Sequence, residues 1–187
     1  MKHLFTAVVM ALSLQTASAI EVEGVKFDDK VKLGTADLVI NGTGVRSKFG
    51  KRYVAVLYVG AKSSDPKTVI ESKGPKRVVL HLLKDGDGKT FSKAFGNGIK
   101  DNAGSGLAAI QDKVNAFSDV MVSLGDVKAG TVITIDFVPE KGTQVNVNGK
   151  PQGKEIAGED FFKALLKVWL GDDPVQDDLK AGLLGKS

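Results

Sequence analysis

Two consecutive segments rich in Val, Leu, Ile and Tyr constrain the fold of this chain more than any other feature. They cover residues 37–46 and 52–60, and Gly50 lies in the short stretch between them. β-Branched and aromatic residues are typical of strands, and a glycine between two such runs is typical of a turn. We therefore expect two neighbouring antiparallel strands here, and a fold organised around a sheet.

The order of the remaining patterns indicates the fold class. Strands are expected over residues 77–83, 131–138, 143–147 and 154–156, and helices over 67–71, 90–106, 107–121, 159–170 and 175–184. Strands, then helices, then a hairpin, then helices favour an α+β fold with one antiparallel sheet and the helices gathered on one face. No internal repeat or long linker divides the chain.

The helix signals differ in strength. Asp65 followed by Pro66 is a favourable N-cap and first-turn pair, and Gly171 is a suitable stop for the helix over 159–170. The pattern over 90–106 is weaker, because Gly96 and Gly98 interrupt it and a glycine costs a helix up to about 1 kcal/mol relative to alanine.

The N-terminus has the pattern of a cleaved secretory signal. Lys2 and His3 precede an apolar run over residues 4–14, and Ala17-Ser18-Ala19 supplies the small residues that a signal peptidase accepts. The apolar run is shorter than the ~20 residues that a membrane-spanning helix needs. We therefore expect residues 1–19 to be a signal peptide and residues 20–187 to form one secreted domain, located in a bacterial periplasm.

Composition excludes several classes of function. The chain has no cysteine, which removes disulfides, Cys-ligated zinc and a thiol nucleophile. The net charge is +4, but lysines are interspersed with acidic residues and aromatic residues are few, so the basic stripe of a nucleic-acid-binding protein is not seen. After the expected cleavage no run is long and apolar enough to span a membrane.

Few residues could carry catalysis or bind a metal. His81 is the only histidine after the expected signal, so one chain cannot assemble a His-based relay or a two-histidine metal site, and we expect it to be structural. The run from Asp85 to Gly88 resembles the start of a calcium loop, but Lys89 and Gly96 stand where later oxygen ligands are needed. We predict a polar turn there, and no metal or cofactor.

Arg46 is the candidate binding residue. It ends the segment over 42–46, and its guanidinium can hold a carboxylate or phenolate through two parallel hydrogen bonds if it points beneath the helices. At the edge of a sheet in water it would have no such role, which is the commoner situation for an arginine.

Three segments together resemble the bacterial secreted branch of the chalcone isomerase-like family. They are GVRSKFGKRYVAVLYVG (44–60), KTFSKAFGNGI (89–99) and FFKALLKVWLGDDPV (161–175), and the similarity covers nearly all of the chain after the expected signal. The resemblance implies an open-faced β-sandwich, in which a large antiparallel sheet carries a layer of helices and a ligand cleft lies between them.

Plant chalcone isomerases close a flavanone ring without a cofactor, through attack of a phenolate on an enone. The resemblance places Arg46 at the family arginine, which stabilises anionic character. Tyr53 stands at the position of a threonine and Phe91 at that of a tyrosine, the pair that organises water at the ketone, while Gly98, beside Asn97, stands at that of an asparagine that holds the distal phenol. Phenylalanine cannot donate a hydrogen bond, so the group that polarises the ketone is lost unless Tyr53 replaces it.

Non-catalytic members of the same fold resemble fatty-acid-binding proteins, in which an arginine, often with a tyrosine, holds the carboxylate and an apolar cleft holds the tail. This use matches the residues present better than catalysis does. We therefore expect a binder of a small amphipathic or aromatic acid, such as a fatty acid, rather than an enzyme. Its expected ligand-binding residues are Arg46, Tyr53, Phe91, Phe95 and Asn97.

Two alternatives stay open. One is an intramolecular lyase of chalcone isomerase type acting on an enone or phenolic substrate, with Arg46 as electrophile and Tyr53 as acid. The other is a structural or partner-binding module of the cell envelope, in which Arg46 is a sheet-edge residue. The sequence names neither the ligand nor the oligomeric state, and Phe91, Phe95 and Trp169 are bulky enough to fill a cleft.

Overall fold

A seven-stranded antiparallel sheet organises the computed structural model, which describes residues 18–186. The expected signal peptide therefore lies almost entirely outside the described residues. The strands are β3 (Lys30–Leu33), β4 (Ala36–Ser47), β5 (Lys51–Val59), β6 (Lys76–Leu82), β9 (Val132–Val138), β10 (Gly142–Val147) and β11 (Lys150–Ile156). Their order across the sheet is β11-β10-β9-β6-β5-β4-β3, so β3 and β11 form its edges.

The expected pair of neighbouring strands is confirmed as β4 and β5. Their register places Arg46 directly opposite Tyr53, so both side chains point to the same face of the sheet. Along β5, Tyr53 and Leu57 belong to the core beneath the helices, whereas Val54 and Val56 belong to a second apolar cluster on the opposite face. Burial on both faces explains why β5 reads as a continuous apolar run.

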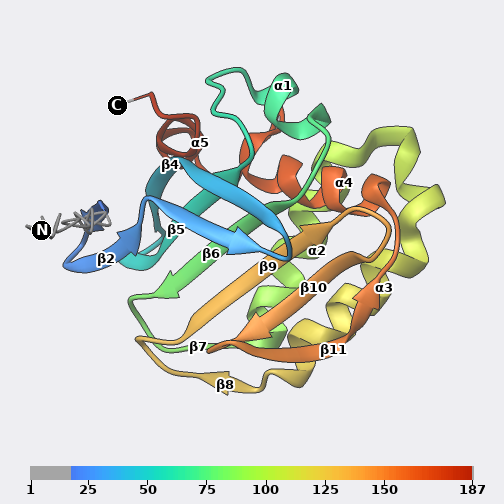
Figure 1. The fold of residues 1–187 in the computed structure, drawn as a ribbon. Helices are drawn as coiled ribbons and strands as arrows, with labels where there is room; N and C mark the ends of the chain where they lie inside the picture. Colours follow the sequence, from blue (N-terminus) through green and yellow to red (C-terminus); the bar gives the residue numbers. More distant parts are fainter. Residues whose placement is uncertain (1–17, 187) are drawn as a thin grey trace, which may run out of the picture.

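The helices are α1 (Pro66–Glu71), α2 (Gly88–Ala103), α3 (Leu107–Ser123), α4 (Glu159–Leu170) and α5 (Asp177–Leu183). Figure 1 shows α2, α3 and α4 gathered on one side of the sheet, which confirms the α+β class and the open-faced sandwich. Asp65 caps α1 as expected, since its carboxylate accepts a hydrogen bond from the Thr68 N–H at 2.6 Å. No helix within residues 18–186 is long and apolar enough to cross a bilayer.

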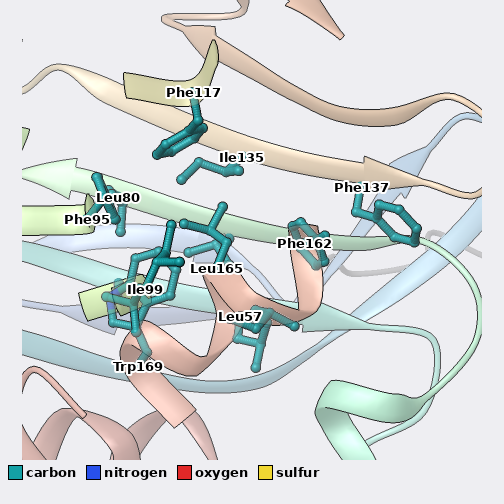
Figure 2. Packing of buried hydrophobic residues seen from close by; sticks show 14 of the residues in the cluster. Leu57, Leu80, Phe95, Ile99, Phe117, Ile135, Phe137, Phe162, Leu165 and Trp169 are labelled. Carbon is teal, nitrogen blue, oxygen red and sulfur yellow. The ribbon is translucent and has the colours of Figure 1, made fainter. Parts of the chain in front are cut away.

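Aromatic side chains fill the space between the sheet and the helices (Figure 2). Phe137 of β9 stacks on Phe162 of α4, with 4.9 Å between the ring centroids. Phe95 of α2 meets Trp169 of α4 edge-on at 5.5 Å. Such pairs add about 0.5–1.5 kcal/mol each to the stabilisation that comes from burying their area. These contacts fix α2 and α4 on the sheet, and α2 and α4 are the helices that form the site.

Several elements differ from the sequence expectation. Helix α2 begins at Gly88 rather than residue 90, because Asp87 caps it by accepting from the Thr90 N–H at 2.9 Å. The helix also ends at Ala103, and a 3-10 turn over Gly104–Gly106 joins it to α3. Strand β11 begins at Lys150 rather than residue 154, because the chain turns after Val147 and Lys150 already pairs with Val147 of β10.

Two short N-terminal strands were not predicted from the sequence. A hairpin of β1 (Ala19–Val22) and β2 (Val25–Asp28) packs on the face of the sheet away from the helices. There the ring of Phe27 meets that of His81 edge-on at 6.2 Å, so His81 has a packing role on the outer face. A second small pair, β7 (Gly86–Asp87) with β8 (Asp126–Val127), lies beside the start of α2.

Candidate functional site

A cleft lies between α2 and the end of the sheet where β4 meets β5. Arg46 and Tyr53 line it from the sheet, and Phe91 and Phe95 line it from the helix. Its cavity volume is about 150 Å³. A cavity of this size accepts one group about as large as benzene. Four of the five predicted binding residues are therefore brought together, and the cleft is open rather than filled.

Arg46 is half-buried and is oriented by Gln176, the residue that precedes α5. Its Nη1 donates to the Gln176 Oε1 at 3.1 Å and to the Ser47 carbonyl at 2.9 Å. Gln176 also accepts from the Ser47 N–H at 2.9 Å and donates to the Val45 carbonyl at 3.1 Å. The side chain of Gln176 thus ties the end of β4 to the start of α5. No carboxylate within residues 18–186 forms an ion pair with Arg46.

Tyr53 is 9% exposed, and its hydroxyl accepts a hydrogen bond from the Trp169 indole Nε1 at 3.2 Å. An indole N–H can only donate, so the phenol proton of Tyr53 remains available for another acceptor. Burial raises the pKa of Tyr53, while the Trp169 hydrogen bond and the charge of Arg46 act in the opposite direction. The hydroxyl is therefore neutral at physiological pH and can donate a hydrogen bond.

The apolar side of the cleft comes from α2 and α4. Phe91 is half-buried and stacks on Phe95, with 6.5 Å between their centroids. Phe95 and Trp169 are almost completely buried and pack against each other, as Figure 2 shows. Val168 of α4 and Val175, just before α5, complete this lining. Phe91 is the most exposed aromatic residue of the lining.

Asn97 lies away from this cleft. It is exposed, and it lines a separate shallow depression between α2 and α3 together with Ser92 and Gln111. A step of two residues turns a helix by about 200°, which carries Asn97 to the side of α2 opposite Phe95. Gly98, by contrast, faces α4, because a Cβ at that position would lie 2.9 Å from Val168.

Three cations form the rim of the cleft, and we call them the cationic rim: Lys48, Arg52 and Lys84. Two acidic residues also line it, but both are already engaged. Asp85 accepts from the Ala129 N–H and from Lys128, both at 2.9 Å, and these contacts lower its pKa. Asp87 is occupied as the cap of α2, which lowers its pKa as well. The polar turn predicted for residues 85–88 is therefore not observed, because Gly86 and Asp87 pair as β7 and Gly88 begins α2.

Some residues of the site could not be found from the sequence. Gln176 is 130 residues away from Arg46, and no local pattern marks such a contact. The cationic rim comes from the turn after β4, from β5 and from the loop after β6, and its members come together only when these strands pair. Predicting the pairing with its register would have placed Arg46 and Arg52 at the same end of the sheet.

Comparisons with known proteins agree with this architecture. A family model described as chalcone isomerase-like matches residues 19–185. A search of curated proteins finds no match. Among solved structures, the crystal structure of a fatty-acid binding protein from Arabidopsis thaliana is similar with a TM-score of 0.68, covering 89% of this chain and 96% of that chain at 12% sequence identity. At this identity the likeness concerns the fold.

Proposed function

Because the chain belongs to the chalcone isomerase-like family, we propose that it uses the cleft between sheet and helices to bind a small amphipathic acid, such as a fatty acid, without converting it. The Arabidopsis protein with the same fold is a fatty-acid binding protein, which supports this choice of ligand class.

The pairing of Arg46 with Tyr53 carries the proposal. The two residues face each other across β4 and β5, and residues directly opposite in an antiparallel pair have Cβ atoms about 4.5–5.5 Å apart. Within residues 18–186, the Nε and Nη2 of Arg46 and the phenol proton of Tyr53 have no hydrogen-bond partner. A carboxylate has two oxygens that can accept from both side chains at once.

The remaining polar groups of the cleft favour binding over catalysis. Phe91 offers no hydroxyl, and the hydroxyl of Thr90 is already donated to the Asp87 carboxylate at 2.6 Å. Of the hydroxyl groups that line the cleft, only that of Tyr53 is free to polarise a ketone, and a missing donor of this kind costs about 3 kcal/mol of transition-state stabilisation. A carboxylate needs only to be held, and Arg46 with Tyr53 suffices for that.

The apolar lining would supply most of the affinity. Each buried CH₂ contributes about 0.8 kcal/mol, so a tail packed against Phe91, Phe95 and Val168 adds affinity, while Arg46 sets the orientation of the head group. The cavity of about 150 Å³ fits a short tail or one aromatic ring. A longer tail would have to displace Phe91 or extend past the cationic rim.

Native mass spectrometry of protein purified without detergent, followed by organic extraction, tests the proposal. We expect a co-purifying fatty or aromatic acid that is absent from the Arg46→Ala variant. The Lys141→Ala variant is the control, because it removes an exposed cation from the turn between β9 and β10, at the opposite end of the sheet.

Titration of the purified protein with fatty acids gives a second measurement, followed by the fluorescence of Trp169, the only tryptophan of the chain. An empty protein that also rejects a panel of fatty acids would contradict the proposal. Turnover of a chalcone that disappears in Arg46→Ala would favour the intramolecular lyase instead.

We also propose that residues 1–19 direct export and are then removed. The charged start, the short apolar run and the small residues before Ile20 support this. The mass of the protein recovered from the periplasmic fraction of a bacterial host should correspond to a chain that begins at Ile20. Recovery of the uncleaved chain from the cytoplasm would contradict the proposal.

A further inference from the structure

Phe49 is the most exposed large apolar side chain of residues 18–186. It lies at the tip of the β4–β5 hairpin, residues 47–51, which we call the hairpin tip, and 92% of its surface is exposed. Ile20 and Val122, the other exposed large apolar residues of the described chain, reach only 38% and 41%. Packing within the fold therefore does not account for a phenylalanine at this position.

The backbone at the hairpin tip does not account for it either. Phe49 has a φ of 53°, in the left-handed region that glycine and asparagine adopt easily and bulky residues rarely do. The side chain is thus kept in water on a backbone that disfavours it. An outlier of this kind points to a role outside the folded chain.

Positive charge surrounds Phe49. Lys48 precedes it, and the Lys84 Nζ reaches the hairpin tip, lying 3.9 Å from where a Cβ on Gly50 would be. With Arg52 these residues make up the cationic rim, and none of them forms an ion pair within the part of the chain that the structure describes. Lys51 differs, since it binds the Glu23 carboxylate at 2.6 Å.

We propose that the hairpin tip docks this protein on an anionic lipid bilayer. Phe49 enters the headgroup region, and Lys48, Arg52 and Lys84 contact lipid phosphates around it. An aromatic side chain favours the membrane interface, and long basic side chains keep their charge at the phosphates while their stems cover apolar surface. The complementary charge of an anionic surface adds attraction for each cation near it.

A bilayer fits the hairpin tip better than a protein partner does. A stable protein interface buries about 800 Å² on each side, with an apolar centre made of several residues. The hairpin tip offers one isolated ring among flexible cations, which suits insertion at a point into a fluid surface. Its apolar residue projects into water with no apolar neighbour from the described chain exposed to the same degree.

Docking in this orientation would bring the rim of the cleft to the membrane. Lys48, Arg52 and Lys84 line the cleft as well as flanking Phe49. The docking surface goes beyond the proposed function and does not depend on it, because vesicle binding can be measured with an empty cleft. A negative result for docking on lipid therefore does not contradict the proposal that the cleft binds an acid, and the reverse also holds.

Co-sedimentation with lipid vesicles tests the docking surface. The protein used begins at Ala19, because the apolar segment over residues 4–14 would itself enter lipid, and every strand and helix of the described fold lies from Ala19 onward. We expect binding to vesicles of phosphatidylethanolamine and phosphatidylglycerol, weaker binding to phosphatidylcholine alone, and loss of binding as salt is raised.

The variants separate the apolar contribution from the charged one. Phe49→Asn removes the ring and suits the left-handed backbone, so it should fold normally and bind about tenfold more weakly. Lys48→Gln combined with Lys84→Gln should reduce binding to the anionic vesicles only. Val122→Ser and Lys141→Gln are the apolar and cationic controls from other parts of the surface, and both should bind as the unmodified protein does.

Three outcomes would overturn docking on lipid. One is no binding to protein-free vesicles, another is binding that Phe49→Asn leaves unchanged, and a third is equal binding to both kinds of vesicle. Binding only to membranes that retain their proteins would assign the hairpin tip to a protein partner and would equally contradict the proposal.

Discussion

Trp169 donates its indole N–H to the hydroxyl of Tyr53 over 3.2 Å, and this hydrogen bond joins α4 to β5. Both side chains are buried, with 1% and 9% of their surfaces exposed. The phenol oxygen is the acceptor in this bond, so its proton stays available for an acceptor in the cleft that Tyr53 lines. One hydroxyl thus serves the core as an acceptor and the site as a donor.

Tyr53→Phe should affect both stability and binding. The substitution leaves the Trp169 N–H buried without an acceptor, which costs about 1–3 kcal/mol, and it removes one donor from the proposed carboxylate site. We expect a lower urea midpoint and weaker binding of fatty acids. Tyr58→Phe is the matched control, because the Tyr58 hydroxyl donates to the Asp28 carbonyl at 2.8 Å on the outer face. It should lower stability and leave binding intact; equal binding by both variants would remove Tyr53 from the site.

Gly42→Ala should loosen α5 from the sheet. A Cβ at Gly42 would lie 2.1 Å from the carbonyl oxygen of Gly182 in α5, so backbone would have to move. Overpacking of this kind costs about 1–3 kcal/mol. Gly60→Ala is the control, since nothing lies within 4 Å of its Cβ position. Urea unfolding should show a clear loss of stability for the first variant and little change for the second; the same midpoint for both would mean that α5 shifts without cost.

Lys76 makes stability depend on pH. It is 1% exposed, and burial lowers its pKa below the usual value of 10.5. Between the lowered pKa and 10.5 the unfolded chain holds more protons than the folded one, so this lysine makes stability rise with pH across that window. A methionine does not titrate.

The free energy of unfolding of Lys76→Met, relative to that of the unmodified protein, should therefore be most favourable at neutral pH, and this difference should shrink as pH approaches 10.5. Urea unfolding at several pH values measures this difference in the free energy of unfolding. The variant also loses the hydrogen bond from Lys76 to the Ser72 carbonyl, but the test depends on how the difference changes with pH and not on its absolute size. Lys141→Met controls for removal of a positive charge from an exposed position. A difference that stays constant with pH would show that Lys76 keeps an ordinary affinity for its proton.

Phe91→Ala should change which acids bind. Phe91 is half-buried in the cleft wall, so its removal enlarges the cavity at a modest cost to the core. We expect longer fatty acids to bind more tightly and short ones more weakly, measured by Trp169 fluorescence. Phe49→Asn, measured in the absence of vesicles, is the control, because Phe49 does not line the cleft. An unchanged preference for tail length would show that the tail of the fatty acid does not pass Phe91.

Local signals predicted some elements closely. The helix expected over residues 159–170 is α4 with the same bounds, because its acidic first turn, its apolar face and the Gly171 that follows all act within one short segment. In α2, the two glycines that weakened the pattern differ in role. Gly98 allows α4 to approach, whereas no contact around Gly96 requires a glycine.

Features that depend on contacts between residues far apart in the sequence could not be predicted from local sequence patterns. Strands β1 and β2 are four residues each, and their apolar residues become a pattern only against the outer face of the sheet. For Asn97, one step along α2 from Gly98 turns the side chain by about 100°, away from α4. A neighbour in sequence therefore cannot substitute for a residue that must face the cleft. Gln176 was not predicted as part of the site because it contacts Arg46 from a position 130 residues further along the chain.

The two edges of the large sheet limit how copies of this protein can associate. Strand β3 is four residues long and exposes Lys30 and Lys32. At the other edge, β11 contains Pro151, which has no N–H to offer, and Gly153, whose φ of 64° breaks the regular pleat. A β3 strand from another copy would meet electrostatic repulsion between lysines at the β3 edge. At the β11 edge, a strand from another copy would meet an interrupted row of backbone hydrogen-bonding groups. We therefore expect neither edge of the large sheet to pair readily with a strand from another copy.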